Sequence, residues 1–401
     1  MQVTNGNLYW KKKSNIKNTY AYLTEDIKCD VLVIGGGITG AITAYLLSKE
    51  GANVVIVEKN IVGYAATAAS SGILECAMDA DMCKLQKVIG EGTSKRIYKL
   101  CENAIKLLEN INSNFKIDTG FKRQDFLYFA NKFMQKASML KELAIRKDAG
   151  FDAEFIESSK VLNLSSGVIS KNACAVMDPY LFLQALFDYL DKLKNIRIFE
   201  NTDITNIDTS TDCVLCKTNN NFKITADSTI FCTGAEALKY IKNAPVELSR
   251  VFSIVTKPIY KLKNMDISFV AKDSVSPCHY MRSDNGRIIL SGENIKLSEK
   301  MSDKKYLSSL SNEKYKKLYS LLKKNINNIE DISVEYAYNS IHINTKDNLP
   351  IIDEMPNMPN CFCNLSFGSN GIVYGTIGAD MLKNAIKGFY TKDMNIFKIN
   401  R

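Results

Sequence analysis

Residues 29–59 read CDVLVIGGGITGAITAYLLSKEGANVVIVEK, and the pattern of this stretch predicts the fold. The apolar, β-branched run at 31–34 predicts a buried parallel strand. Residues 38–49 place Ala, Leu and Ile three and four positions apart, which indicates a helix. The apolar run at 53–57 predicts a second buried strand. Together these runs predict a strand–helix–strand unit on a parallel sheet.

Three glycines join the first strand to the helix with the spacing G-x-G-x-x-G, at Gly35, Gly37 and Gly40. The first makes a tight turn, the second lets a pyrophosphate approach the backbone, and the third lets the helix pack on the strand. The amides that begin the helix then face the phosphates, helped by the helix dipole. Glu58, at the tip of the second strand, can accept hydrogen bonds from ribose hydroxyls. We interpret the unit as a dinucleotide site, in preference to a glycine turn without a nucleotide.

Composition places the chain among ordinary globular proteins. Its 401 residues allow two domains or one large domain with insertions, and 46% of them are apolar. No apolar run is long enough for a membrane span, and the amino terminus lacks the apolar core of a signal peptide. The net charge of +9 comes from scattered lysines, which we read as a solvated surface in preference to steering of an anionic substrate. No arginine-rich helix or basic–aromatic array indicates nucleic-acid binding.

The cysteine and histidine content limits the kinds of metal site and active site that the chain can form. Eleven cysteines without a secretory signal predict free thiols in the reducing cytoplasm. The closest cysteine pairs lie in strand-like runs without a nearby histidine, so no zinc site or other metal is expected. The only two histidines are His279 and His342, too few for a multi-histidine metal centre, and they give a Ser-His-Asp hydrolase little to build from.

Two further segments flank this unit. Residues 63–72 are almost all small, so they can follow a flat ligand closely and offer amides and hydroxyls without bulk; the alternative is a flexible loop. Residues 8–13 are predicted to be an arm on the surface. Further along the chain, helices are predicted at 79–114, 132–150, 180–193, 300–329 (one helix or two) and 373–387. Strands are predicted at 126–129, 196–199, 204–207, 213–217, 222–225, 228–235, within 250–292, at 334–343 and at 360–365.

Seven motifs in the same order resemble the D-amino-acid oxidase/glycine oxidase/sarcosine oxidase family of FAD-dependent oxidoreductases. They are DVLVIGGGITGAITAYLL with VVIVEK, the small-residue loop, AVMDP, STIFCTGA, YMRSDNGRIILSGEN, TKDNLPIID and FGSNGIVYGTIGADML. The resemblance implies an α/β fold in which a Rossmann-type FAD-binding domain is interleaved with an α+β substrate domain built on a mixed sheet. It assigns 1–78, 166–245 and 336–401 to the FAD-binding domain, and 79–165 and 246–335 to the substrate lobe.

The resemblance also implies cofactor contacts at matching positions. Glu58 is expected at the adenosine ribose, Lys59 beside the adenine and Ile204 against the adenine through its backbone. Thr233 and Gly234 are expected near the dinucleotide. The pyrophosphate contacts are expected from Gly35, Gly37, Ile38, Thr39 and Gly40. The contacts along the ribityl chain and the ring edge are expected from Thr67, Ser70, Ser71 and Gly72. The helix start at the flavin N1–C2=O edge is expected from Gly368, Asn370, Gly371 and Ile372.

The substrate side departs from the best-known members of the family. Glycine-oxidase-like enzymes carry a carboxylate-binding arginine shortly before the TKDNLPIID motif, and His342 stands at that position here. Arg282 is the remaining candidate anion clamp, or else a structural ion-pair partner, and Tyr280 is expected on the same face of its strand. His342 is either catalytic or a satisfied core histidine. Cys278 is read as a buried thiol, in preference to a covalent flavin link.

The resulting hypothesis is an FAD-dependent enzyme that oxidises the C–N bond of a small amine or amino acid by hydride transfer to flavin N5. Oxygen or an unidentified acceptor would then reoxidise the flavin. Two alternatives stay open. One is a dehydrogenase of a hydroxy acid or polyol phosphate on the same fold, and the other is a flavin-binding scaffold or assembly factor without turnover.

Overall fold

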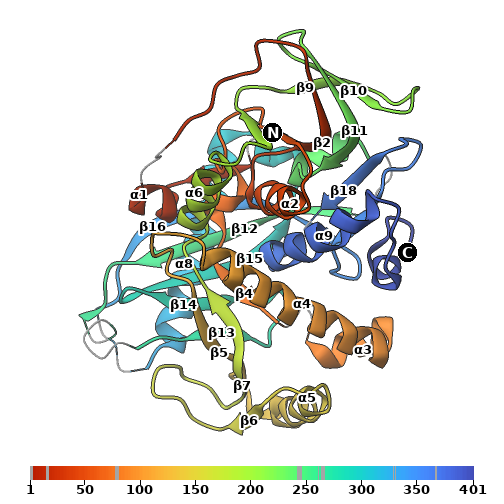
Figure 1. Cartoon of the computed structure of the whole chain (residues 1–401). Coiled ribbons are helices and arrows are strands. Elements are labelled where there is room, and N and C mark those ends of the chain that lie inside the picture. The colour runs from red at the N-terminus through yellow and green to blue at the C-terminus, as the bar shows by residue number, and fades with distance from the viewer. Residues whose placement is uncertain are drawn as a thin grey trace.

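The computed structural model describes residues 3–14, 18–76, 81–241, 246–260, 262, 267–327, 329, 331–365 and 368–401. Two large sheets dominate it, an eight-stranded sheet in the upper part of Figure 1 and a ten-stranded sheet in the lower part. The fold is mixed α/β, as predicted. The predicted domain boundaries at 78/79 and 245/246, the predicted helix start at Asp79, and Phe367 of the last motif lie outside the described residues.

The eight-stranded sheet carries the glycine-rich unit. Its path runs β17 (Ile351–Glu354), β18 (Cys361–Leu365), β11 (Lys223–Phe231), β2 (Ile27–Ile34), β3 (Val54–Val57) and β8 (Ile196–Phe199), with β10 (Val214–Thr218) and β9 (Ile204–Asp208) joined through β11. The strands from β18 to β8 are parallel to one another. Since the carboxyl ends of parallel strands share one edge, the turns after β2, β3 and β11 meet there.

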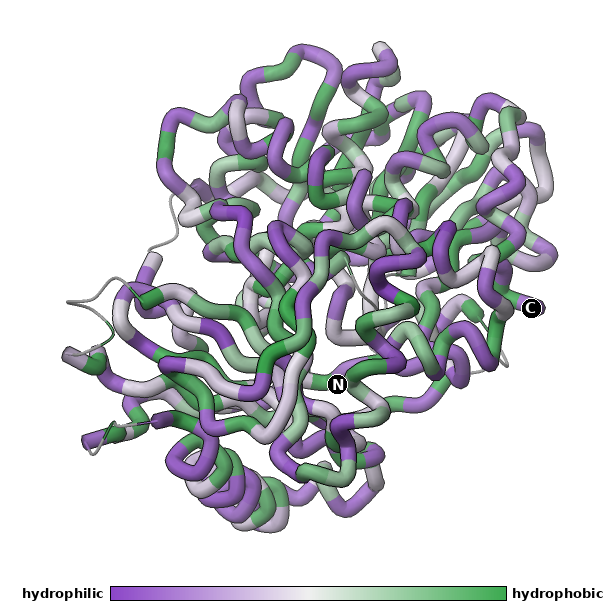
Figure 2. Tube along the Cα trace, turned by 90° about the horizontal axis from the view of Figure 1, so that it is seen from below, coloured by the Kyte–Doolittle hydropathy of each residue, from purple (hydrophilic) through white to green (hydrophobic). Residues whose placement is uncertain are grey.

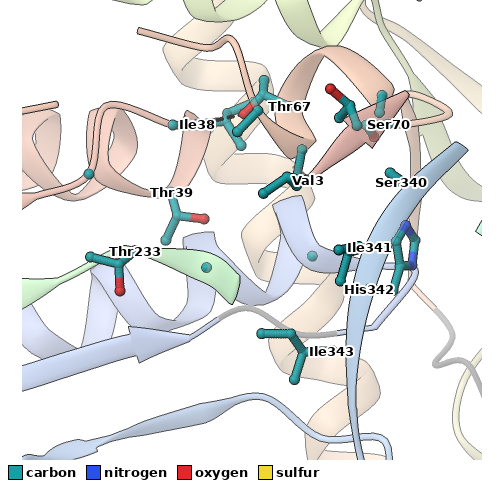
Figure 3. A pocket seen from close by; sticks show the side chains of 18 of the residues that line it. Val3, Ile38, Thr39, Thr67, Ser70, Thr233, Ser340, Ile341, His342 and Ile343 are labelled. Atoms are coloured by element: carbon teal, nitrogen blue, oxygen red, sulfur yellow. Dashed lines mark hydrogen bonds between the residues drawn. The ribbon is translucent and has the colours of Figure 1, made fainter. Parts of the chain in front are cut away.

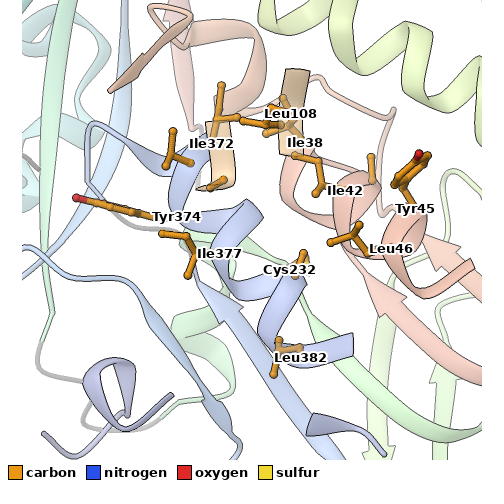
Figure 4. Packing of buried hydrophobic residues seen from close by; sticks show 14 of the residues in the cluster. Ile38, Ile42, Tyr45, Leu46, Leu108, Cys232, Ile372, Tyr374, Ile377 and Leu382 are labelled. Atoms are coloured by element: carbon orange, nitrogen blue, oxygen red, sulfur yellow. The ribbon is translucent and has the colours of Figure 1, made fainter. Parts of the chain in front are cut away.

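Helix α2 (Ile38–Lys49) begins at the residue predicted for it and packs against α9 (Gly371–Ala385), from the other end of the chain. Figure 4 shows Ile38, Ile42 and Ile377 in the apolar layer that these helices share. Two further helices, α4 (Glu91–Asn112) and α6 (Pro179–Leu190), contribute to the same core. Burial of this layer fixes the amino-terminal ends of α2 and α9 relative to each other.

The ten-stranded sheet forms the opposite wall. Its order is β1 (Thr4–Gly6), β16 (Val334–Thr345), β12 (Val246–Thr256), β15 (Arg287–Lys296), β14 (Tyr280–Asp284), β13 (Val270–Asp273), β5 (Lys122–Ala130), β7 (Ser166–Val176) and β4 (Ile73–Glu75), with β6 (Ala153–Ile156) on β7. Helices α8 (Lys304–Asn325), α5 (Lys136–Asp148) and α3 (Met82–Ile89) lie on this part of the molecule (Figure 1). Among the helices of the described residues, none is both long and apolar enough to cross a bilayer.

The strand pairing differs from the sequence-based expectations at several points. β1, β4, β7 and, from residue 336 onward, β16 fall in segments assigned to the FAD-binding domain, but they hydrogen-bond within the ten-stranded sheet. The two strands predicted at 222–225 and 228–235 are one strand, β11. The strands β1, β4, β6, β7 and β17 were not predicted, because they are short, or polar at intervals, and are defined by their neighbours. The division into domains itself stays a prediction.

The prediction of a surface arm at 8–13 is wrong for its aromatic residues. Tyr9 is 4% exposed and Trp10 is fully buried, at the start of the short helix α1 (Tyr9–Lys13). The Trp10 indole donates a hydrogen bond to the Ser70 carbonyl (2.7 Å), and the Tyr9 hydroxyl donates one to Asp284 (2.6 Å). The N end of the chain accordingly lies over the middle of the molecule, whereas the C end lies at its edge (Figure 2).

Candidate functional site

One cavity of about 690 Å³ runs between the two sheets. It extends from the carboxyl edge of the eight-stranded sheet to residues of β12, β14, β15 and β16 on the ten-stranded sheet. Figure 3 shows its middle part, where Val3 lies between Thr67 on one side and Ile341 on the other.

Most of the predicted site residues line this cavity. From the glycine-rich unit and the following loop, they are Gly35, Gly37, Ile38, Thr39, Glu58, Lys59, Thr67, Ser70 and Ser71. From the later segments they are Ile204, Thr233, Gly234, Tyr280, His342, Gly368, Asn370, Gly371 and Ile372. Gly40, Gly72 and Arg282 are not among the lining residues. The fold thus brings together segments that are more than 300 residues apart in the chain.

Each glycine of the turn is needed for a different structural reason. Gly35 has φ +118°, and a Cβ added there would lie 2.5 Å from the Cys232 carbonyl oxygen. A Cβ at Gly40 would lie 2.0 Å from the Gly35 carbonyl oxygen, so Gly40 serves helix–strand packing. At Gly37, by contrast, the nearest atom to an added Cβ is the Thr67 hydroxyl at 3.6 Å. The backbone at Gly37 is therefore open toward the cavity, as the approach of a pyrophosphate requires.

The start of α2 faces the cavity without a capping side chain of its own. Gly37 occupies the N-cap position, and the Ile38 amide donates to the Thr67 hydroxyl (3.2 Å). Glu58 accepts from the Gly36 amide (2.8 Å) and from the Asn60 amide (2.9 Å). Burial raises the pKa of Glu58, against the lowering effect of these two amides. The turn, the acid and the loop are thus held in one hydrogen-bonded arrangement that a dinucleotide with ribose hydroxyls fits.

The second helix start belongs to α9. Asn370 is its N-cap residue, and the Asn370 side chain accepts from the Glu75 amide (3.2 Å) and donates to the Glu75 carbonyl (2.7 Å). These two hydrogen bonds join the start of α9 to strand β4 of the ten-stranded sheet. Unpaired amides at a helix start stabilise negative charge, so α9 suits the edge of a flavin that becomes anionic on reduction.

The structure does not support Arg282 as an anion clamp. Its side chain is buried, and its guanidinium donates to the carbonyls of Gly72 (2.9 Å) and Met177 (2.8 Å) and contacts Asp284 (3.3 Å). Burial lowers the pKa of Arg282, with Asp284 acting in the opposite direction. Tyr280 lines the cavity. Arg282, two residues further along β14, instead donates hydrogen bonds to backbone carbonyls of the loop at 71–72. The other reading, a structural ion-pair partner, fits these contacts.

Next to the cavity wall at β14 and β15, a buried histidine lies close to two carboxylates. The Nδ1 atom of His279 is 2.7 Å from Asp273, and its Nε2 atom is 3.5 Å from Glu293. Burial lowers the pKa of His279, but the two carboxylates outweigh burial and raise the pKa above its usual value. Glu293 also pairs with Lys314 on α8 (2.8 Å). His279 itself is not a lining residue, whereas its neighbour Cys278 is.

Several lining residues were missed at the sequence level. They are Val3, Thr4, Ile73, Glu75, Val251, Ser253, Ser291, Asn294 and Ser340. Val3 and Thr4 reach the cavity because β1 pairs with β16, where the Ile341 amide donates to the Val3 carbonyl (2.9 Å). Only Glu75 offered a signal, as an acid inside the apolar run 73–76.

Comparisons with known proteins agree with this architecture. The family model described as DAO, FAD dependent oxidoreductase, matches residues 30–385. The protein YhfW of Bacillus subtilis, described as a Rieske-type iron–sulfur protein, is 31% identical over 196 residues, which are 48% of this chain and 38% of that protein. The chain thus spans less than two fifths of the length of that relative.

Two glycine oxidases match over nearly their whole length. The enzyme of Bacillus subtilis is 22% identical over 390 residues, which cover 93% of this chain and 97% of that enzyme. The crystal structure of glycine oxidase from Geobacillus kaustophilus superposes with a TM-score of 0.74 at 15% identity, over 93% of this chain and 99% of that one. At this identity the superposition shows a common fold.

Proposed function

Because the chain belongs to the family of FAD-dependent oxidoreductases, we propose that it oxidises the C–N bond of a small amine or amino acid. The observation that carries the proposal is the cavity of about 690 Å³ between the two sheets. One end has the features of a dinucleotide site, and the other end is walled by side chains of the ten-stranded sheet. A substrate between them would lie against the sheet on one side and the cofactor ring on the other.

The residues at the dinucleotide end fit FAD. On this proposal, Gly37 and the start of α2 would hold the pyrophosphate, Glu58 would accept from the ribose hydroxyls, and the start of α9 would stabilise negative charge on the ring. The bound FAD supplies the acceptor for the hydride. What the chain itself contributes is position, since a substrate held in a reactive orientation needs no strong side-chain base if its amine is neutral.

The sheet end offers neutral hydrogen-bonding groups to an amine. The hydroxyls of Ser253 and Ser291 are 2.8 Å apart, and both residues line the cavity together with Tyr280 and Asn294. His342, half-buried on β16, also lines it. Such groups can bind an uncharged amine and orient its lone pair. The glycine oxidases that share the fold act on an amino acid, as their names state, and support the same bond class.

A second candidate is oxidation of a hydroxy acid or polyol phosphate. It is favoured by His342, because an imidazole in the cavity can take the proton of a hydroxyl group. An L-α-glycerophosphate oxidase of Mycoplasma pneumoniae also shares the fold, with a TM-score of 0.69 at 19% identity. We propose a cytoplasmic location for either activity, because all eleven cysteines are free thiols.

The test is anaerobic bleaching of the flavin absorbance by a panel of compounds. The panel contains primary amines, N-methyl amines, amino acids of both hands, 2-hydroxy acids and glycerol 3-phosphate. Bleaching by at least one amine or amino acid supports the proposal. Bleaching by hydroxy compounds alone would support the second candidate, oxidation of a hydroxy acid or polyol phosphate. A flavin that no compound bleaches would support a flavin-binding scaffold without turnover.

A further inference from the structure

Strand β15 contains a bulge where it borders the cavity. Its pairing with β12 is regular up to Gly292, but the register shifts before Ile295. Glu293 and Asn294 thus stand opposite one residue of β12, Val251. The backbone of Glu293 has φ +55°, a left-handed conformation that costs free energy in a residue with a side chain. A bulge of this kind changes the direction of the side chains that follow it.

The bulge reverses the two faces of β15. Before the bulge, Ser291 lines the cavity, whereas Leu290 packs in the apolar cluster that β15 shares with α8. After the bulge, Asn294 lines the cavity and Ile295 packs against that cluster. Strict alternation from Ser291 would instead turn Glu293 toward the cavity and Asn294 away from it. The bulge is therefore what brings the Asn294 amide to the cavity.

The bulge is held from the side of α8. A Cβ added at Gly292 would lie 2.3 Å from Cδ2 of His279, so the imidazole occupies the space that a side chain there would need. Nε2 of this imidazole lies 3.5 Å from one carboxylate oxygen of Glu293, and the other oxygen lies 2.8 Å from Nζ of Lys314. Asp273 on β13 lies 2.7 Å from Nδ1 of the same ring and also accepts from the His279 amide (2.9 Å). Contacts from β13, from the residue before β14 and from α8 thus converge on one residue of the bulge.

The charge on the Glu293 carboxylate strengthens this arrangement. Burial raises the pKa of Glu293, but Lys314 and His279 outweigh burial and lower the pKa below its usual value. Hydrogen bonds and ion pairs to a charged carboxylate are stronger than those between neutral groups. Such contacts can hold a residue in a backbone conformation that glycine adopts more easily. The surrounding charges therefore explain why a glutamate stands at this position.

We infer that the Asn294 amide binds the substrate, and that the charged groups around Glu293 position this amide from the other face of the strand. An amide can accept from an amine N–H through its oxygen and donate through its nitrogen. The register places Asn294 beside Val251 of β12, which is paired with Ser340 of β16, and all three line the cavity. Glu293 does not line the cavity, so it acts through its neighbour. This inference rests on the proposed function and names a binding residue of the same site.

The first experiment measures binding of tert-butylamine to the FAD-loaded protein by isothermal titration calorimetry. This amine carries no hydrogen on the carbon next to nitrogen, so it cannot lose a hydride there. Asn294→Ala should weaken binding by about tenfold, the effect of one lost hydrogen bond. Lys314→Met should weaken it by about threefold or more, and Lys314→Arg, which keeps the charge, should restore it. Lys317→Met is the matched control, because Lys317 pairs with Glu313 at the exposed surface of α8 and should leave binding unchanged.

The second experiment follows anaerobic flavin bleaching by an amine that the protein oxidises. Asn294→Ala and Lys314→Met should raise the amine concentration that gives half the limiting rate more than they lower the limiting rate itself. The FAD content of both variants should equal that of the unchanged protein.

Each part of the inference has its own contrary result. If the unchanged protein does not bind tert-butylamine, or if Asn294→Ala binds it equally well, Asn294 is not a binding residue. If Lys314→Met has no more effect than Lys317→Met, the positioning role is wrong. If no amine bleaches the flavin while Asn294→Ala still weakens binding of tert-butylamine, the proposed oxidation fails and the role of Asn294 in amine binding stands.

Discussion

Replacing Arg282 with methionine tests whether this buried guanidinium is structural. Methionine keeps much of the side-chain length and removes the charge. The change takes a donor from the Gly72 and Met177 carbonyls and a charge partner from Asp284. Breaking a buried pair of this kind costs about 3–5 kcal/mol. Since larger proteins show smaller shifts, we take roughly 1–2 °C per kcal/mol, and Tm should fall by about 3–10 °C.

The same substitution should also weaken the hold on FAD, because Arg282 fixes the carbonyls at 71–72 beside two lining residues, Ser70 and Ser71. Thermal unfolding followed by circular dichroism gives Tm, and acid release gives the FAD content per chain. Arg96→Met is the matched control, because Arg96 pairs with Asp393 at the surface and should cost at most about 1 kcal/mol. An Arg282→Met protein with normal Tm and FAD content, impaired only toward anionic substrates, would refute the structural reading and restore the substrate clamp.

Three further predictions concern single residues. Glu58→Gln should lower FAD affinity by one to two decades, measured by fluorescence titration, because a charged acceptor to a hydroxyl contributes about 1.5–3 kcal/mol; unchanged affinity places the ribose elsewhere. Gly40→Ala should abolish soluble, FAD-loaded protein, since its Cβ would lie 2.0 Å from the Gly35 carbonyl oxygen; a normal yield contradicts this packing. His279 has a raised pKa in the folded state, so its pairing with Asp273 stabilises the fold below pH 6.5 and is lost as the pH rises through the raised pKa. Tm should therefore fall over that range, and a His279→Asn protein with the same pH dependence would exclude the histidine as its source.

The glycine-rich unit could be predicted because its signals are local. Helix α2 begins at Ile38 and ends at Lys49 as expected, since Gly37 and Gly51 interrupt the helical pattern on both sides. Strand β3 and the second half of β2, residues 31–34, are apolar runs that are buried throughout. Where hydrophobic periodicity and turn residues agree, the sequence is enough to place an element.

The elements that were missed depend on partners far away in the chain. β1 is three residues of TNG, and only its pairing with β16 makes it a strand and brings Thr4 to the cavity. Trp10 donates to the Ser70 carbonyl and is buried in an apolar cluster with residues of the 63–72 loop, of α6 and of strands β12, β15 and β16. Arg282 shares a strand face with Tyr280, but alternation along a strand does not show where the cavity ends. The cavity ends at the loop at 71–72, to which Arg282 donates.

We propose that a substrate held in this cavity would lose a hydride from the carbon next to its amine nitrogen, with bound FAD as the acceptor. This proposal is tested most directly by stopped-flow measurement of anaerobic flavin bleaching, with one amine supplied in two forms. One form carries hydrogen and the other deuterium on the carbon next to nitrogen. We expect rapid bleaching that is slowed by deuterium at that carbon. Bleaching that is insensitive to the deuterium under saturating amine, or that only hydroxy compounds produce, would contradict it.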